Sequence, residues 1–322
     1  MSVLAILGFG LLLLAQGMAQ ASYPEREITV YCSSSAGGIT DLTARFLSEA
    51  VSKALGQPLV VVNKPGAAHT ICVNLIANSK PDGYTFGFVG GSGLVQAPNF
   101  RKVPYDVRKD FTYIARCAEY PMGLTVLIDA PWKNLEEFLD YAKKNPGKVI
   151  YSSDGHGGGA HILMEYLAWK KGGIEWKHIP YSGGARNAPA LLGRHTTAWA
   201  AAGSQVSFIR DGKMKMLASF NETRGKVAPD VPTLRELGYV DHPVGLFIFL
   251  IAPKGLPDPI AKKLEDAFLK AMKDPSYAKF MDKLEMIPAL LGAKEAGKDI
   301  ESQAKYWAEL IKITGIKDKE EK

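Results

Sequence analysis

The feature that most constrains the fold is a strand-like run that ends in serines and glycines and passes directly into a helix-like pattern. It occurs twice, as YCSSSAGGITDLTARF from residue 31 and as YSSDGHGGGAH from residue 151. Around these turns, β-branched runs alternate with amphipathic segments of helical period over almost the whole chain. Such alternation predicts parallel or mixed sheets with helices on both faces. One turn in each half predicts two α/β lobes.

Both turns have a composition that suits an anion. Free N–H groups in the first turn of a helix favour negative charge, and glycine lets a ligand approach the backbone closely. Serine and threonine hydroxyls add hydrogen-bond donors without adding charge. One such turn could equally be an ordinary serine-capped turn, but two at matching points favour an anion site. Because ligands of open α/β sheets bind beside the carboxyl ends of strands, two facing lobes would form a cleft there.

Length and composition agree with a globular protein of two domains. The chain has 322 residues, of which 47% are hydrophobic and 22% charged. The net charge of +6 is spread over helix-like segments in which acids stand beside the basic residues, so no nucleic-acid partner is expected. Cys32, Cys72 and Cys117 form no CxxC pair, and we expect buried free thiols.

The amino-terminal segment resembles a secretory signal peptide. Residues 1–21 are apolar and end in the small-residue pattern Ala19-Gln20-Ala21, which predicts export to the periplasm and cleavage near Ala21. No Lys or Arg precedes the apolar run, so an uncleaved anchor remains the alternative. The longest later apolar run, GLFIFLIAP, has the length of a strand rather than of a membrane span.

Two enzyme motifs are matched only in part. The segment GHGGGA and the later Glu175 imitate a dinucleotide-binding fingerprint, but Glu175 follows two glycines in a loop instead of ending a strand. The HGGG sequence from His156 resembles a lipase oxyanion motif, but no G-x-S-x-G elbow follows it. His156 and His161 are five residues apart, and His178 is isolated in sequence. No cofactor and no metal site are therefore expected.

Further motifs follow in a characteristic order between Tyr23 and Ile316, among them KPDGYTFGFV, VPYDVRKDF, HIPYSGGARNAPALLGR and LIAPKGLPDPI. In this order and spacing the chain resembles the Bug receptors, the extracytoplasmic solute receptors of tripartite tricarboxylate transporters. The resemblance implies an α/β, two-lobed periplasmic-binding-protein (clamshell) fold, with each lobe a mixed sheet flanked by helices. It divides the chain into a signal peptide (1–21), a discontinuous first lobe (22–121 plus 245–322) and a second lobe (122–244).

The resemblance also implies a function without catalysis. A receptor of this type, expected to be a monomer, captures a small organic acid in the interlobe cleft and delivers it to membrane permease subunits. The acid would be a mono- or dicarboxylate, possibly aromatic. Closure is expected through Glu119–Gly123 and Asp241–Gly245, where the chain should cross between lobes. The alternatives are a secreted, esterase-like α/β hydrolase and a sensor that docks on a signalling protein.

The ligand-binding positions that the resemblance implies gather in four loops. In the first lobe they are Ser35, Ala36, Gly37, Gly38, Thr40, Asp41, Gly91 and Ser92. In the second lobe they are Ser153, Asp154, Gly155, His156, Gly157, His161, Tyr181, Ser182, Gly183 and Arg186. For His161, packing within its helix is as well supported as ligand contact.

Asp154 and Arg186 depart from the residues usual in the family, and Ala200 and Ala201 make the neighbouring wall less polar. Asp154 and Arg186 could pair, which would favour a monocarboxylate or aromatic acid. Alternatively, Asp154 could meet a ligand hydroxyl or amine while Arg186 binds a second carboxylate. In the third interpretation Arg186 faces solvent and Asp154 caps the next helix. The less polar wall favours pairing.

Overall fold

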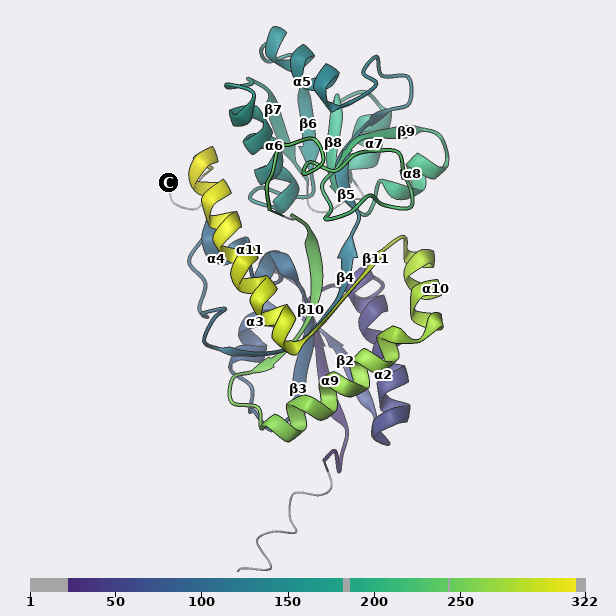
Figure 1. The fold of residues 1–322 in the computed structure, drawn as a ribbon, viewed down its shortest axis with the longest axis vertical. Helices are drawn as coiled ribbons and strands as arrows, with labels where there is room; N and C mark the ends of the chain where they lie inside the picture. The colour runs from purple at the N-terminus through teal and green to yellow at the C-terminus, as the bar shows by residue number, and fades with distance from the viewer. Residues whose placement is uncertain (1–22, 182–185, 243, 317–322) are drawn as a thin grey trace, which may run out of the picture.

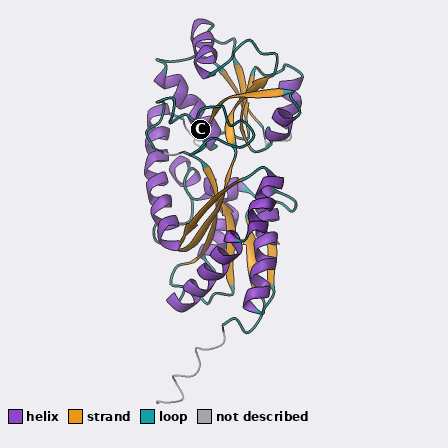
Figure 2. Cartoon of the chain, turned by 45° about the vertical axis from the view of Figure 1, so that its right-hand side comes forward, coloured by secondary structure: helices purple, strands orange, loops and turns teal. Residues whose placement is uncertain are grey.

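The computed structural model describes residues 23–181, 186–242 and 244–316. The predicted signal peptide, Ser182 and Gly183 lie outside the described residues. Figure 1 shows two α/β lobes arranged one above the other along the long axis of the molecule. Each lobe contains one sheet, and Figure 2 shows helices on both sides of each sheet. Across the described ranges, no helix has both the length and the apolar character needed to cross a membrane.

The sheet of the first lobe has six strands in the order β11-β4-β10-β3-β1-β2. Their bounds are β1 Ile28–Cys32, β2 Leu59–Asn63, β3 Thr85–Gly90, β4 Phe111–Tyr120, β10 Leu246–Pro253 and β11 Ile287–Gly292. β1 runs parallel to β2 and β3, whereas β10 is antiparallel to β3 and β4, so the sheet is mixed. The β10 strand comes from the other end of the chain, which makes this lobe discontinuous in sequence.

The helices of the first lobe pack against this sheet through apolar faces. They are α2 Ile39–Leu55, α3 Thr70–Ala77, α4 Ala97–Phe100, α9 Asp258–Lys273, α10 Pro275–Leu284 and α11 Ala293–Thr314, with the short 3-10 turns η1 Ala67–His69 and η2 Gly91–Gly93. On α2, Ala44, Leu47 and Val51 recur at helical spacing and are fully buried. The helix ends at Gly56, whose φ of 74° is the left-handed conformation that favours glycine. Cys32, Cys72 and Cys117 are buried free thiols, as predicted.

The sheet of the second lobe has five strands in the order β7-β6-β8-β5-β9. Its elements are β5 Met122–Leu127, α5 Leu135–Lys144, β6 Ile150–Ser153, α6 Gly159–Lys170, β7 Lys177–Pro180, α7 Asn187–Leu192, β8 Ala198–Ala202, α8 Val206–Arg210 and β9 Met214–Ser219. β6 is parallel to β7 and β8, whereas β5 is antiparallel to β8 and β9. Asn134, the N-cap of α5, accepts a hydrogen bond from the backbone N–H of Glu137 at 2.9 Å.

The chain passes between the lobes where β4 continues through Pro121 into β5, and again just before β10 (Figure 1). Glu119, at the end of β4, is buried at this junction. Its carboxyl accepts hydrogen bonds from the Asn221 side chain at 2.8 Å and from the Glu222 backbone at 3.1 Å. A Cβ atom on Gly245 would come within 2.5 Å of Glu119 Oε1. The Glu119 carboxyl therefore packs against both connections.

We expect Glu119 to make stability depend on pH. Burial raises its pKa to about 8. The folded protein therefore holds a proton that the unfolded chain releases between about pH 4.5 and 8, and stability falls as pH rises through that window. Glu119→Gln should remove this pH dependence, and at pH 9 its free energy of unfolding should exceed that of wild type by on the order of 3 kcal/mol. Denaturant titrations from pH 5 to 9 measure the free energy of unfolding of wild type and Glu119→Gln. Glu175→Gln is the control, because Glu175 is exposed. Parallel curves for wild type and Glu119→Gln would contradict it.

Candidate functional site

A cavity of about 550 Å³ lies between the two lobes, at the carboxyl ends of β1, β3 and β6. Its walls include both glycine turns that the sequence singles out. A second hollow of about 610 Å³ lies on the outer surface beside the end of α2 and contains none of the predicted ligand-binding residues. The cavity between the lobes is therefore the candidate site.

The two turns have the same helix-start geometry. The N-caps Gly38 of α2 and Gly158 of α6 both have φ −72° and ψ 159°, and neither has a side-chain cap within the described structure. In α2 the Asp41 N–H donates to Ser34 Oγ at 3.1 Å, so the first-turn donors that the described structure leaves without a side-chain partner there are the N–H groups of Ile39 and Thr40, both in the cavity wall. The repeat seen in sequence is also a repeat in three dimensions, with one helix start from each lobe lining one cavity.

Eleven of the predicted ligand-binding residues line this cavity. They are Gly37, Gly38, Thr40, Gly91, Ser92, Ser153, Asp154, Gly155, His156, Gly157 and His161. Of the predicted residues that the structure describes, five lie outside the cavity wall, namely Ser35, Ala36, Asp41, Tyr181 and Arg186.

Asp41, which was expected to contact the ligand, is buried outside the cavity wall and supports the first turn from behind. Its carboxylate is buried and accepts hydrogen bonds from the Gly37 N–H at 2.9 Å, Arg45 Nε at 3.0 Å and Asn63 Nδ2 at 2.7 Å. Burial alone would raise the pKa of Asp41, but the hydrogen bonds from Arg45, Asn63 and Gly37 together lower it. Asp41 therefore holds the turn in shape through these hydrogen bonds.

The second turn is held by hydrogen bonds that the sequence spacing does not reveal. Ser153 Oγ donates to the Gly155 carbonyl at 3.0 Å and lies 2.7 Å from His178 Nε2. The Gly157 N–H donates to His161 Nδ1 at 3.0 Å, so His161 fixes the turn and also lines the cavity. Gly157 has a φ of 71°, and Phe100 of the first lobe occupies the place that a side chain there would need. The two lobes are in contact at this point.

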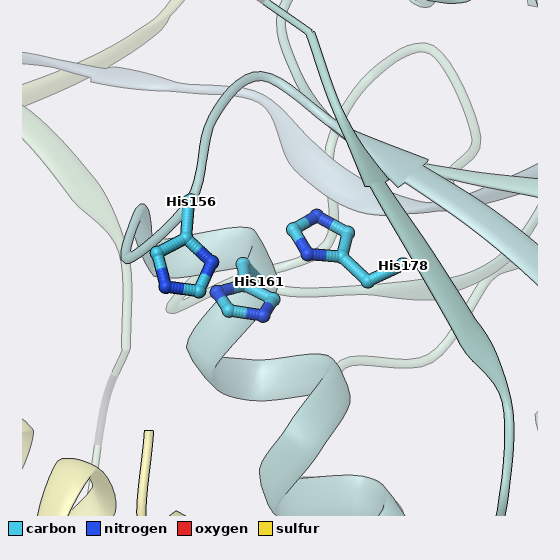
Figure 3. Close-up of side chains that lie close together, drawn as sticks. All are labelled: His156, His161 and His178. Atoms are coloured by element: carbon cyan, nitrogen blue, oxygen red, sulfur yellow. The ribbon is translucent and has the colours of Figure 1, made fainter. Parts of the chain in front are cut away.

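Three histidines gather at the second turn (Figure 3). One nitrogen from each of His156, His161 and His178 lies within 4.8 Å of the others. The treatment of His178 as isolated is thereby corrected, because β7 pairs with β6 and places His178 opposite Tyr151. The rings of His161 and His178 stack face to face, with centroids 3.9 Å apart.

The stacking of the His161 and His178 rings argues against a metal site. A metal ion binds the in-plane lone pair of an imidazole nitrogen, and stacked rings direct those lone pairs side by side rather than at one point. The Nδ1 lone pair of His161 also accepts the Gly157 N–H. We therefore keep the prediction that no metal is bound here.

Asp154 is paired with groups other than Arg186, which corrects the favoured interpretation. Asp154 Oδ1 accepts from Asn187 Nδ2 at 3.0 Å and from Trp199 Nε1 at 3.3 Å, and Oδ2 accepts from the Ala202 N–H at 3.1 Å. Arg186 is exposed. The reason is topological, because β6 lies beside β8 and brings Asp154 to the end of that strand. Burial raises the pKa of Asp154 to about 6, although the bonds from Ala202 and Trp199 lower it.

Several cavity residues were missed by the sequence analysis. They include His69, Gln96, Phe100, Arg101, Tyr120 and Leu246. His69 is held by Ser33, whose Oγ lies 2.8 Å from His69 Nδ1. Apart from histidines, the charged side chains in the described cavity wall are Arg101 and Asp154. A repeat or motif search could not find the segment from Gln96 to Arg101, because α4 has only four residues and the sequence around it has no regular pattern.

Two α/β lobes whose paired glycine turns line one interlobe cavity define a solute-binding protein of the periplasmic type. The sequence profile described as tripartite tricarboxylate transporter family receptor matches residues 43–316, and the chain belongs to this family. The predicted resemblance and the two-lobed fold are both confirmed. The family consists of solute-binding receptors, so the prediction of a receptor rather than an enzyme is confirmed as well.

Individual relatives agree over nearly the whole chain. The "UPF0065 protein in gbd 5'region" of Cupriavidus necator is 37% identical over 302 residues, covering 92% of this chain and 90% of that protein. The periplasmic binding protein BugD shares 31% identity with a TM-score of 0.76, over 92% of this chain and 99% of BugD. MatC from Rhodopseudomonas palustris, solved with bound malate, shares 27% identity with a TM-score of 0.74, over 90% of this chain and 100% of MatC.

Proposed function

We propose that this receptor captures a small organic acid in the interlobe cavity and delivers it to permease subunits in the membrane. The observation that carries the proposal is the first turn, where the start of α2 meets the cavity with the backbone N–H groups of Ile39 and Thr40 and with the hydroxyls of Ser34 and Thr40. A helix of 17 residues adds a favourable field for a carboxylate at this end. The bound malate of MatC supports a carboxylate as the ligand group.

The proposed ligand contacts are the eleven predicted residues that line the cavity. Thr40 is held by a hydrogen bond with Tyr120, which orients the threonine side chain at the mouth of α2. Asp41 fixes Gly37 from behind, so the turn is formed before the ligand arrives. Preorganised donors of this kind lose little entropy on binding, which favours capture at low concentration. The proposed location is the periplasm, after cleavage near Ala21, and the proposed state is a monomer.

Calorimetry on the mature protein tests the proposal. The panel should hold monocarboxylates, dicarboxylates and aromatic acids, with uncharged amides of the same size as controls. We expect at least one acid to bind and its fully neutral amide to fail, because the first turn offers donors to a carboxylate. Failure of every acid to bind, in a protein with a cooperative thermal transition, would contradict the proposal.

Ligand binding should also close the lobes around the cavity. The predicted hinge segments lie near Glu119–Gly123 and Asp241–Gly245. They are supported by the strand assignment, because β4 and β5 belong to different sheets and so do β9 and β10. A bound acid that touches both glycine turns would stabilise the closed arrangement, since excluding water strengthens its hydrogen bonds. Small-angle X-ray scattering at saturating ligand should show a smaller radius of gyration than without ligand. An unchanged radius at saturation would argue against closure.

A further inference from the structure

Gln96 is a buried polar residue whose side chain makes no hydrogen bond with either glycine turn in the described structure. It stands just before α4, is 1% exposed and lines the cavity. Neither its Oε1 nor its Nε2 has a hydrogen-bond partner in the described structure. Burying an amide without partners is unfavourable, and nearly all buried polar atoms in proteins are paired. The amide of Gln96 is therefore suited to a partner that enters the cavity.

The backbone around Gln96 is firmly held. Its carbonyl accepts hydrogen bonds from the N–H groups of Asn99 and Phe100, both at 3.0 Å. The Asn99 side chain in turn donates to Val95 at 2.7 Å and to Ala304 of α11 at 2.9 Å. The position of Gln96 is thus fixed by the turn of α4 and, through Asn99, by α11, and a local rearrangement would break these contacts.

The amide of Gln96 lies where the two lobes meet. A Cβ atom placed on Gly159, the first residue of α6, would lie 3.4 Å from Gln96 Nε2. Because Gly159 has no side chain, nothing of that residue separates the amide from the start of α6. Trp307 and Leu246 lie 3.1 and 3.5 Å from the same Cβ position and form the apolar sides of this space. A ligand group that reaches the amide would contact the first lobe through Gln96 and the second lobe through the first turn of α6.

We propose that Gln96 and the start of α6 form a distal subsite for an uncharged polar group of the ligand, such as a carboxamide, a hydroxyl or an un-ionised carboxylic acid. An amide side chain offers a donor and an acceptor, and such a group can pair with both, whereas a carboxylate has no donor for Oε1. The inference rests on the proposed function and refines it: one ionised carboxylate binds at the first turn and a neutral polar group binds at Gln96. Asp154 in the same wall disfavours a second anion.

The test uses acids of equal chain length that differ only at the far end. Butanoate, 4-hydroxybutanoate, succinamate and succinate form one such series, and the five- and six-carbon series extend it. Affinities are measured for wild type, Gln96→Leu and Gln96→Glu. The control is Gln303→Leu, because Gln303 is also a buried glutamine but bonds to Asp299 and lies outside the cavity wall.

Wild type should bind the amide- or hydroxyl-ended acid roughly 10-fold more tightly than the apolar or dicarboxylate member of its series. Gln96→Leu should erase this preference. Its melting temperature without ligand should stay the same or rise by about 2 °C, because an amide without partners has been replaced by an apolar group. Gln303→Leu should instead lower the melting temperature and keep the preference.

Several results would overturn the inference while leaving the organic-acid receptor intact. One is that acids bind but Gln96→Leu and Gln96→Glu keep the wild-type preference. Another is a preference for dicarboxylates that disappears in Arg101→Ala, which would assign the distal end to the arginine. A large drop in melting temperature, or failure to fold, in Gln96→Leu would show that Gln96 is structural. If no acid of any series binds wild type, the proposed function itself fails.

Discussion

Replacing Gly37 by valine should reduce ligand affinity by more than about 100-fold while both lobes stay folded. Gly37 has a φ of 78°, a conformation that β-branched residues adopt at a cost of roughly 1–2 kcal/mol. Gly37 lines the cavity, and no heavy atom lies within 4 Å of the place where its Cβ would be. A valine would therefore either fill the space of the carboxylate or distort the turn and break the Gly37–Asp41 hydrogen bond.

The other end of the same helix provides a matched control. Gly56 has a φ of 74° and also has no neighbouring atom within 4 Å of a Cβ position, but it lies outside the cavity wall. Gly56→Val should lose a similar amount of stability and keep its affinity. Thermal unfolding of both variants measures the stability lost to backbone strain. Calorimetry with an acid that binds wild type measures the affinity lost through the change in the binding site. Equal affinity in Gly37→Val and wild type would remove the first turn from the binding site.

The sequence predicted the fold well because the determining patterns are local. The glycine turns before α2 and α6 are specified by a few adjacent residues, since strand, turn and helix signals follow one another directly. The length of the apolar run GLFIFLIAP likewise predicted β10. The residues of these turns that face the cavity could be predicted for the same reason, because first-turn positions of a helix point past the end of the preceding strand.

The remaining contacts of the site depend on which strands become neighbours, and local patterns do not contain that information. His178 joins His156 and His161 only because β7 pairs with β6. The three donors to Asp154 come from residues 33, 45 and 48 positions further along the chain. Gln96 stands just before the four-residue α4, in a stretch whose sequence has no regular pattern to indicate that this residue lines the cavity.

The hydrogen bonds of Asp154 lead to a second prediction with a large expected effect, on stability and on ligand affinity. Asp154→Ala should destabilise the protein by about 2–4 kcal/mol, because it leaves Trp199 Nε1, the Ala202 N–H and the Asn187 amide without their acceptor. Loss of these bonds should also release the turn before α6, so affinity for an acid should fall. Asp154→Asn should cost less, since its single side-chain oxygen can keep some of the three donors.

The exposed Arg186 should behave as an independent residue. Arg186→Ala should change stability by less than about 0.5 kcal/mol, as is usual for surface positions, and the double variant should equal the sum of the single changes within about 0.5 kcal/mol. Denaturant unfolding and calorimetry of the four proteins of this cycle measure the coupling. A coupling well above that limit would show that Arg186 reaches Asp154 in solution and neutralises it there. Additive effects would instead leave the charge of Asp154 balanced by an indole, a side-chain amide and a backbone N–H. The wall of the second lobe would then keep its own negative charge, which disfavours a second carboxylate on the ligand.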